Sequence, residues 1–198
     1  MRFIKEHFDN IVRLIIFQVG IAIFSFFLYT AVGAMSGENT SSLTVKVLIS
    51  VFSILFYFTL IHTMMWEEGA KDRIRVDSGR AVRQKFKGAG TAFFANVLNF
   101  LITGIAVLLM AVYVAGGPEG FKTAFGVLNL VFRLILSMYL GVIQAVFVAA
   151  EANADLYFFL QAIGYFLAPL LTIVAAHVSY SLGYAEKRIF GFLSSKKK

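Results

Sequence analysis

The chain has 198 residues, of which 59% are hydrophobic and 15% are charged, and its formal net charge is +7. Soluble domains are about 45–50% apolar, so this composition excludes an ordinary water-soluble globular protein. Cysteine is absent from the sequence, which therefore offers neither a disulfide nor a thiolate metal site. The positive charges flank long apolar segments, and this distribution favours a membrane protein over a nucleic-acid-binding protein.

The first long apolar segment runs from residue 14 to residue 37 without a charged side chain. About 20 apolar residues, each rising about 1.5 Å along a helix, cross a hydrocarbon layer of about 30 Å. The apolar region of a secretory signal has only about 7–15 residues, so we expect this first helix to be retained. Four further uncharged segments follow, at 47–66, 88–118, 134–150 and 156–185.

The connections between these segments differ strongly in charge. Glycine and proline at 116–118 mark a turn, whereas 67–87 is a hydrophilic loop with seven basic residues. Residues 1–13 hold three basic residues, and 185–198 hold five. Basic residues collect on the cytoplasmic side of membrane proteins. We therefore expect a plasma-membrane protein whose N-terminus, basic loop at 67–90 and basic tail at 185–198 face the cytoplasm.

Five complete crossings would leave the N-terminus and the basic tail on opposite sides of the membrane. Residues 121–150 are the segment that we expect not to cross, because they contain Arg133 and lead into an acidic stretch without lysine or arginine. We predict that this segment is re-entrant or interfacial. The predicted fold is an all-α polytopic transmembrane bundle in one domain, 1–198, and the alternative has five or six spans. The four full spans are predicted at about 11–34, 45–66, 91–115 and 157–184.

Polar side chains recur every three or four residues within the apolar segments, which places them on single helix faces. Such stripes either form hydrogen bonds between packed helices or line a hydrated cavity, and both interpretations stay open. Ala168, Thr172 and Ala176 form a small face that favours close packing. Gly33 and Gly37 form a GxxxG pair, which is a weaker signal of the same kind. The candidate residues for a polar cavity are Asn96, Asn99, Arg133, Gln144, Gln161, His62 and His177.

Arg133 is the most unusual of these candidates. An arginine at the centre of a membrane helix costs about 2.5–3.5 kcal/mol on insertion scales, so such a residue is by default a functional hypothesis. In a shallow segment its guanidinium can instead extend to the lipid headgroups. The sequence supports both a functional group and an interfacial anchor.

The sequence offers little for catalysis. His62 and His177 could meet across the bundle, but two histidines without a third ligand do not form a zinc site of the usual kind. There is no nucleophile–base set, no carboxylate pair within the apolar segments and no phosphate-binding glycine loop. We therefore expect no enzymatic activity, no catalytic or metal-binding residue and no cofactor.

A purely basic run leads into the third apolar segment, and it consists of Arg80, Arg83, Lys85 and Lys87. If this run were helical, it would form an interfacial amphipathic helix on anionic lipid, with Val82 and Phe86 nearly opposite the charges. Ordinary cytoplasmic anchoring also explains the basic residues. We expect no nucleic-acid partner, because Phe86 is the only aromatic side chain of this loop that could stack on a base.

Several short motifs resemble those of a group of small multi-span membrane proteins from Gram-positive bacteria. They are the Trp-Glu-Glu-Gly-Ala-Lys-Asp-Arg segment at 66–73, Gly79-Arg80, Lys-Phe-Lys-Gly at 85–88, Ala95-Asn96 and Leu-Gly-Tyr at 182–184. Ile74 follows the Asp-Arg pair, where the group usually has Asn. That group has no assigned activity, so the resemblance implies a bacterial plasma membrane and no mechanism.

Two functions remain as hypotheses. The first is a non-catalytic accessory or oligomeric membrane component. Its expected partners are the lipid bilayer, anionic lipids at the cytoplasmic face, and copies of itself or other membrane subunits. The alternative is a small-solute transporter or the substrate-binding membrane subunit of a transport system. A pocket of about 300 Å³ or more that reaches the polar stripes would favour the alternative.

Overall fold

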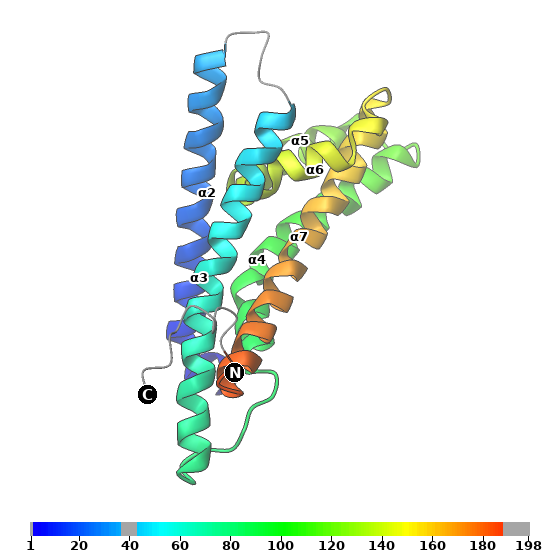
Figure 1. Cartoon of the computed structure of the whole chain (residues 1–198). Helices are drawn as coiled ribbons and strands as arrows, with labels where there is room; N and C mark the ends of the chain where they lie inside the picture. Colours follow the sequence, from blue (N-terminus) through cyan, green and yellow to red (C-terminus); the bar gives the residue numbers. More distant parts are fainter. Residues whose placement is uncertain (1, 37–42, 188–198) are drawn as a thin grey trace.

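The computed structural model describes residues 2–36 and 43–187, and this part of the chain contains helices and no strand (Figure 1). A short helix at the N-terminus precedes the long ones, and two short 3-10 turns interrupt the second half. The α-helices are α1 (Arg2–Glu6), α2 (Phe8–Ser36), α3 (Leu43–Asp77), α4 (Lys87–Val114), α5 (Glu119–Ile135), α6 (Leu140–Val146) and α7 (Ala154–Tyr184). The 3-10 turns are η1 (Ser137–Tyr139) and η2 (Val148–Ala150).

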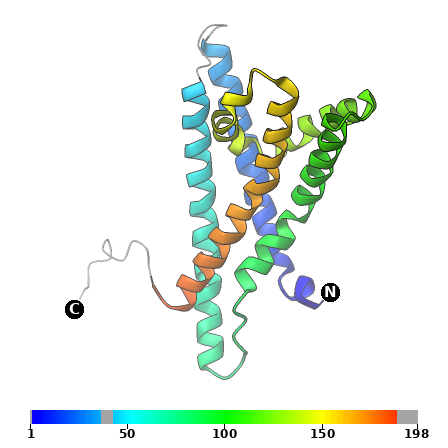
Figure 2. The same cartoon turned by 90° about the vertical axis from the view of Figure 1, so that its right-hand side faces the viewer.

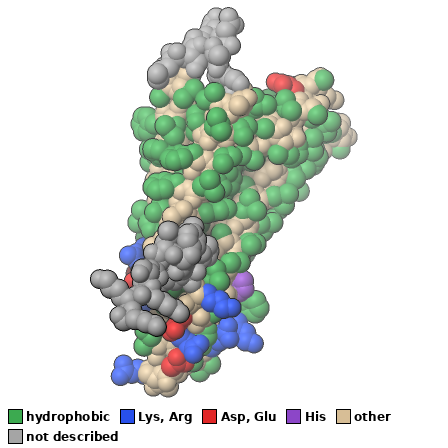
Figure 3. Space-filling model, viewed as in Figure 1, with side chains coloured by type: hydrophobic (Ala, Val, Ile, Leu, Met, Phe, Trp, Pro, Cys, Tyr) green, Lys and Arg blue, Asp and Glu red, His purple; other side chains and the backbone are tan. Residues whose placement is uncertain are grey.

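Four helices of the described chain, α2, α3, α4 and α7, are long and apolar enough to cross a membrane. Large apolar side chains cover their outer faces and leave a continuous hydrophobic surface along the bundle (Figure 3). Phe27 and Leu98, for example, are 66% and 69% exposed. Such a surface would be strongly unfavourable in water and suits the hydrocarbon of a bilayer. The prediction of a helical membrane bundle with four full spans is confirmed.

One boundary of the prediction is wrong. Residues 67–77 were assigned to the loop, but α3 continues through them to Asp77 and reaches 35 residues. At about 1.5 Å per residue this helix exceeds the hydrocarbon thickness, so its last turns project beyond it. Ion pairs of i,i+4 spacing, Glu67 with Lys71 and Arg73 with Asp77, stabilise the projecting turns.

The bundle has two chemically different ends. We call the end where α2 and α4 begin and α3 and α7 finish the basic end, and the opposite end the turn end (Figures 1 and 2). At the basic end the His7 ring lies 3.0 Å from the Gln84 side chain. At the turn end Lys122 Nζ lies 2.9 Å from Asp155 Oδ1, and this ion pair joins the beginnings of α5 and α7.

Helices α5 and α6 do not add a crossing. The chain turns by 88° between Glu119–Ile135 and Ser137–Val146. The pair leaves α4 and rejoins α7 at the same turn end, where α5 and α6 lie across the bundle (Figure 1). Residues 119–150 are therefore re-entrant, and the two ends of the described chain lie together at the basic end, as an even number of crossings requires.

The tip of the re-entrant segment is attached to α2 and α3 by hydrogen bonds. Ser137 Oγ donates to the Ala22 carbonyl oxygen at 2.7 Å. The Gly141 backbone N–H donates to Ser50 Oγ at 2.8 Å and to the Tyr29 hydroxyl at 3.1 Å. Backbone that turns at membrane depth is stable only where protein supplies such partners, so these side chains permit the turn.

Small residues bring the spanning helices close together. The predicted small face of α7, Ala168, Thr172 and Ala176, is buried. A Cβ added at Gly88 of α4 would lie 2.6 Å from the Ala176 carbonyl oxygen, so α4 and α7 make backbone contact there. The other predicted small pair includes Gly37, which lies outside the described residues.

The amphipathic helix considered for 80–87 does not form. Residues 78–86 are turn and irregular backbone, and α4 begins only at Lys87. Gly79 has a φ of 72°, which a glycine adopts without strain and which ends α3. Arg80, Arg83 and Lys85 therefore lie on an exposed loop, whereas Lys87 belongs to α4 (Figure 2).

Replacing Gly141 tests the seating of the re-entrant tip. In Gly141→Ala the new Cβ would overlap the Lys46 carbonyl oxygen, which is backbone and cannot move aside. We expect a loss of about 3 kcal/mol in the free energy of unfolding, measured by denaturation in detergent micelles. Gly126→Ala is the matched control in the same segment, because nothing lies within 4 Å of its added Cβ. Equal stability of the two variants would contradict the docked tip.

Candidate functional site

The most polar junction of the bundle lies at the basic end and centres on Lys87. The Lys87 ammonium is 2.8 Å from Asp72 Oδ2 and 3.4 Å from Glu68 Oε2, and the residue is only 5% exposed. Tyr180 donates its hydroxyl to Asp72 Oδ2 at 2.8 Å, and Asn10 donates from Nδ2 to Glu68 Oε2 at 3.1 Å. We call these five residues the ionic cluster. It joins α2, α3, α4 and α7, so all four spans meet at one set of charges.

Local sequence explains how the ionic cluster assembles. Glu68 and Asp72 are four residues apart on α3 and therefore share one helix face. Gly69 lies between them, where a Cβ would overlap the Tyr180 carbonyl oxygen of α7. The close approach that glycine allows brings the Tyr180 hydroxyl to the carboxylates. Lys87 is the first residue of α4, so its long side chain reaches both acids from the helix end.

A small cavity of about 110 Å³ adjoins the ionic cluster. The polar side chains of His7, Asp72, Arg75, Gln84 and Lys87 form part of its wall. Ligand pockets are usually about 300–1,000 Å³, so this space is too small for a typical metabolite. Because the buried charges are paired with one another, the cluster fits a structural junction better than a reactive site.

The position of Lys87 corrects one prediction. It was grouped with the lipid-surface residues Arg80, Arg83 and Lys85, but it is buried and paired with carboxylates. The other three side chains are exposed. None of the three is paired with a carboxylate in the described part of the chain, and the Arg83 guanidinium lies 4.3 Å from the centre of the Tyr184 ring. The reason for the difference is that Lys87 opens α4 and faces α3, whereas the loop carries the others outward.

The predicted asparagine stripe is used within its own helix. Asn96 donates from Nδ2 to the Ala92 carbonyl oxygen at 2.9 Å, and Asn99 donates to Asn96 Oδ1 at 2.8 Å. Thr103 Oγ1 continues the stripe by donating to the Asn99 carbonyl oxygen at 2.6 Å. All three side chains are buried. This stripe therefore belongs to the packed face of α4.

Arg133 and Gln161 do meet. Arg133 donates from one terminal nitrogen to Gln161 Oε1, which joins α5 to α7, and its guanidinium carbon lies 5.9 Å from the centre of the Phe158 ring. Gln161 is 1% exposed. No carboxylate among the described residues pairs with Arg133, and its Nε is buried without a partner. Gln144, on α6, is half-buried and forms no side-chain hydrogen bond within the described chain.

The two histidines have different surroundings. His62 Nδ1 lies 3.1 Å from Ser179 Oγ, across the contact of α3 with α7. His177 stacks on the Phe86 ring at 5.7 Å between centres, on the side of α4. The proposed meeting of the two rings is not seen. Within residues 2–36 and 43–187, no group of three or more histidine, aspartate or glutamate side chains could hold a metal ion.

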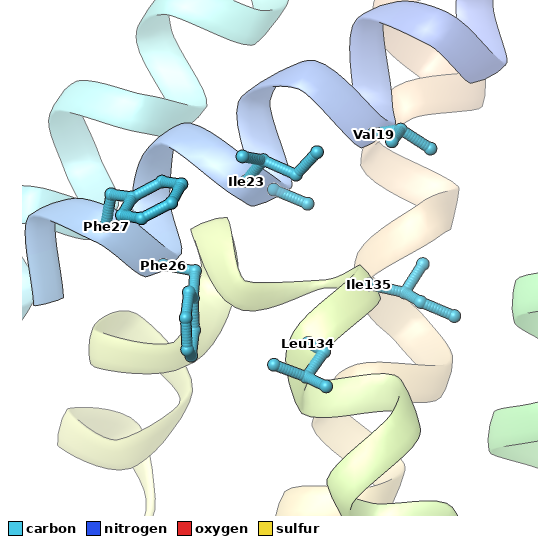
Figure 4. A pocket seen from close by; sticks show the side chains of 7 residues that line it. Val19, Ile23, Phe26, Phe27, Leu134 and Ile135 are labelled. Atoms are coloured by element: carbon cyan, nitrogen blue, oxygen red, sulfur yellow. The ribbon is translucent and has the colours of Figure 1, made fainter. Parts of the chain in front are cut away.

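Two of the larger spaces in the structure do not reach the residues predicted to line a polar cavity. A groove of about 370 Å³ lies between α2 and the end of α5, and its walls, such as Phe26, Phe27 and Leu134, are apolar (Figure 4). A cavity of about 470 Å³ opens at the turn end beside Tyr113 and Asp155. None of the seven candidates for a polar cavity lines either of these spaces, so the structure distributes them over separate helix contacts.

The hydrogen-bond and ion-pair acceptors that hold the ionic cluster and the re-entrant tip were not identified from the sequence. Glu68 and Asp72 were treated as part of a mixed-charge loop, although their i,i+4 spacing indicated a shared face. Tyr29 and Ser50 were seen only as members of polar stripes. Their common target, the Gly141 N–H, lies 112 and 91 residues away along the chain, and no local pattern connects them.

Removing the Lys87 charge tests the ionic cluster. In Lys87→Met the half-buried carboxylates of Glu68 and Asp72 lose their one buried counter-charge and keep only Lys71 and Arg75 at 3.6 Å. We expect a loss of about 3 kcal/mol in the free energy of unfolding in micelles. Lys85→Met removes the same charge from the exposed loop two residues earlier, where no carboxylate of the described chain pairs with it, and should cost at most about 0.5 kcal/mol. Adding Asp72→Asn to Lys87→Met should recover part of the loss. Similar values for the two lysine variants would rule out the buried cluster.

Comparisons with known proteins add no functional assignment. No family model matches the chain, and no curated protein or solved structure matches it significantly. The resemblance to small membrane proteins of Gram-positive bacteria therefore stays a prediction that rests on the short motifs. Several residues of those motifs, among them Asp72, Lys87 and Gly183, lie at the basic end around the contacts of α7.

Proposed function

We propose that this chain is a non-catalytic accessory or oligomeric component of a plasma membrane. The observation that carries the proposal is the use of polar side chains inside the bundle. The asparagines of α4, the His62–Ser179 contact and the ionic cluster each close on partners within the protein. Along α4 and at the basic end the polar groups therefore satisfy one another, which suits a stable membrane-embedded subunit better than a solute path. Buried atoms without a partner, such as Arg133 Nε and Gln161 Nε2, bear on the second candidate below.

The charge distribution supports an orientation with both termini in the cytoplasm. Seven basic residues lie at 67–87, around the basic end. Near the turn end the described chain has Lys46, Lys122 and Arg133, and Lys122 is paired with Asp155. By the positive-inside rule the basic end faces the cytoplasm. The resemblance in sequence motifs supports a bacterial membrane.

A second candidate is the substrate-binding membrane subunit of a transport system. The turn-end cavity of about 470 Å³ favours it, since this volume lies in the range of small-molecule pockets. Arg133 and Gln161 would then act below the cavity, because the Arg133 Nε and Gln161 Nε2 atoms are buried donors without partners. This candidate requires water or solute to reach Gln161 from the turn end.

The absence of native cysteine allows a direct test of topology. In single-cysteine variants of the full chain, Ser78→Cys should react with a membrane-impermeant maleimide only from the cytoplasmic side. Gly120→Cys and Ala152→Cys should both react only from the opposite side, because the segment between them is re-entrant. Labelling of Gly120→Cys and Ala152→Cys from different sides of sealed vesicles would disprove the four-span topology.

The same approach separates the two candidate functions. If the bundle is closed, Asn99→Cys and Gln161→Cys should stay unlabelled in the native protein and react after denaturation, while Ala152→Cys reacts throughout. The purified chain alone should also mediate no solute uptake in proteoliposomes and should extract in mild detergent as an assembly larger than 22.0 kDa. Rapid labelling of Gln161→Cys, slowed by a solute, would support the transport subunit instead.

A further inference from the structure

A groove at the basic end combines aromatic walls with a cationic rim. It lies between α1 and the beginning of α4 and has a volume of about 410 Å³. Phe3, Phe86, Phe94 and Gly90 provide its apolar surface, and the Phe3 and Phe94 rings lie 5.7 Å apart. Gly90 is small for a structural reason, because a Cβ there would lie 2.8 Å from the Phe3 ring. The groove is therefore a built feature of the contact between α1 and α4.

The two lysines beside the groove differ in their electrostatic state. Lys87 is neutralised by Asp72 and Glu68 inside the ionic cluster. Lys85 lines the same groove, is exposed and has no carboxylate partner among the described residues. Arg80 and Arg83 lie on the same loop and are likewise unpaired with acids. Among the residues that line the groove, Lys85 thus carries the uncompensated positive charge, and this charge favours an anion.

The position of the groove places that charge at a membrane surface. The loop of residues 78–86 leads directly into α4, whose outer face carries exposed apolar side chains such as Phe93 and Leu98. Phe86 and Val82, on the loop, are 73% and 88% exposed. Burying these two side chains among lipid headgroups and acyl chains would remove apolar surface from water. Lysine and aromatic residues in this arrangement match the two parts of a phospholipid.

We propose that this groove binds an anionic phospholipid from the leaflet at the basic end. Lys85 contacts the phosphate, and an acyl chain lies along Phe3, Phe86 and Phe94. The proposal requires membrane insertion but neither of the two candidate functions. Charge complementarity decides the occupant. Two other occupants would bring positive charge to the positively charged groove and are therefore disfavoured. The chain after residue 187 carries Arg188 and three lysines, and a second copy would bring the same basic loop.

Lipid retention by the intact chain tests the site. The protein is reconstituted with equal amounts of phosphatidylglycerol and phosphatidylcholine, extracted in mild detergent and analysed by native mass spectrometry. We expect one retained phosphatidylglycerol per chain, and Lys85→Gln should lower its affinity about fivefold. Arg80→Gln is the matched control, because Arg80 is exposed on the same loop and unpaired with any carboxylate of the described chain but does not line the groove. Phe94→Ala should weaken retention further by removing an acyl-chain wall.

Several outcomes would overturn the proposal. Equal losses in Lys85→Gln and Arg80→Gln would indicate general surface electrostatics. Equal retention of the two lipids would indicate an apolar groove without anion selectivity. Stronger lipid binding after truncation behind Lys187 would identify the tail as the occupant, and a dimer disrupted by Phe94→Ala would identify a second copy. The melting temperatures of the unmodified protein and of Lys85→Gln, measured without added lipid, verify the fold. They should be equal, because the Lys85 side chain is exposed.

Discussion

The need to satisfy backbone polar groups inside a lipid bilayer governs this structure. Four long helices meet that need within themselves, since the N–H groups beyond the first turn bond to carbonyls of the same helix. The re-entrant segment cannot, because its chain turns by 88° beside α2 and α3. There the Gly141 N–H donates hydrogen bonds to the Ser50 and Tyr29 hydroxyl groups. Because glycine has no side chain, Gly141 can also contact the Lys46 backbone. The turn exists because α2 and α3 supply its missing partners.

The two ends of the bundle handle polarity in different ways. At the basic end, Lys87 balances Glu68 and Asp72, and their hydrogen bonds with Asn10 and Tyr180 join the four spans. Breaking such a buried set costs more than forming it contributes, so the cluster specifies how the helices meet more than it adds stability. At the turn end the charges are fewer, and Arg133 has an amide rather than a carboxylate as its partner. The four-way polar junction therefore lies at the basic end, while a cavity of about 470 Å³ opens at the turn end.

The part of the fold that follows from local composition was predictable. Runs of about 20 apolar residues identified all four spans, and charge parity identified 121–150 as the segment that does not cross. The helical extension of α3 to Asp77 was missed, because its mixed charges were taken as a loop signal although their i,i+4 spacing suits a helix. Of the seven candidate polar residues, Asn96, Asn99 and Gln161 are buried and the other four are half-buried. Periodicity gives only the helix face and not the neighbour. It could not separate His62, beside Ser179, from His177, beside Phe86.

By itself, the sequence determined which segments are long and apolar enough to cross a membrane and which segments are basic, and it left the alternative of five or six spans open. These properties depend on the free energy of moving each segment from water to hydrocarbon, which is a sum over neighbouring residues. Only the tertiary structure decided which lysine is buried: Lys87 pairs with acids of α3, while Lys85, two residues earlier, stays free of them. That choice depends on where α4 begins relative to α3 and α7. Such long-range geometry arises from packing at Gly69, Gly88 and Gly183, and no single segment encodes it.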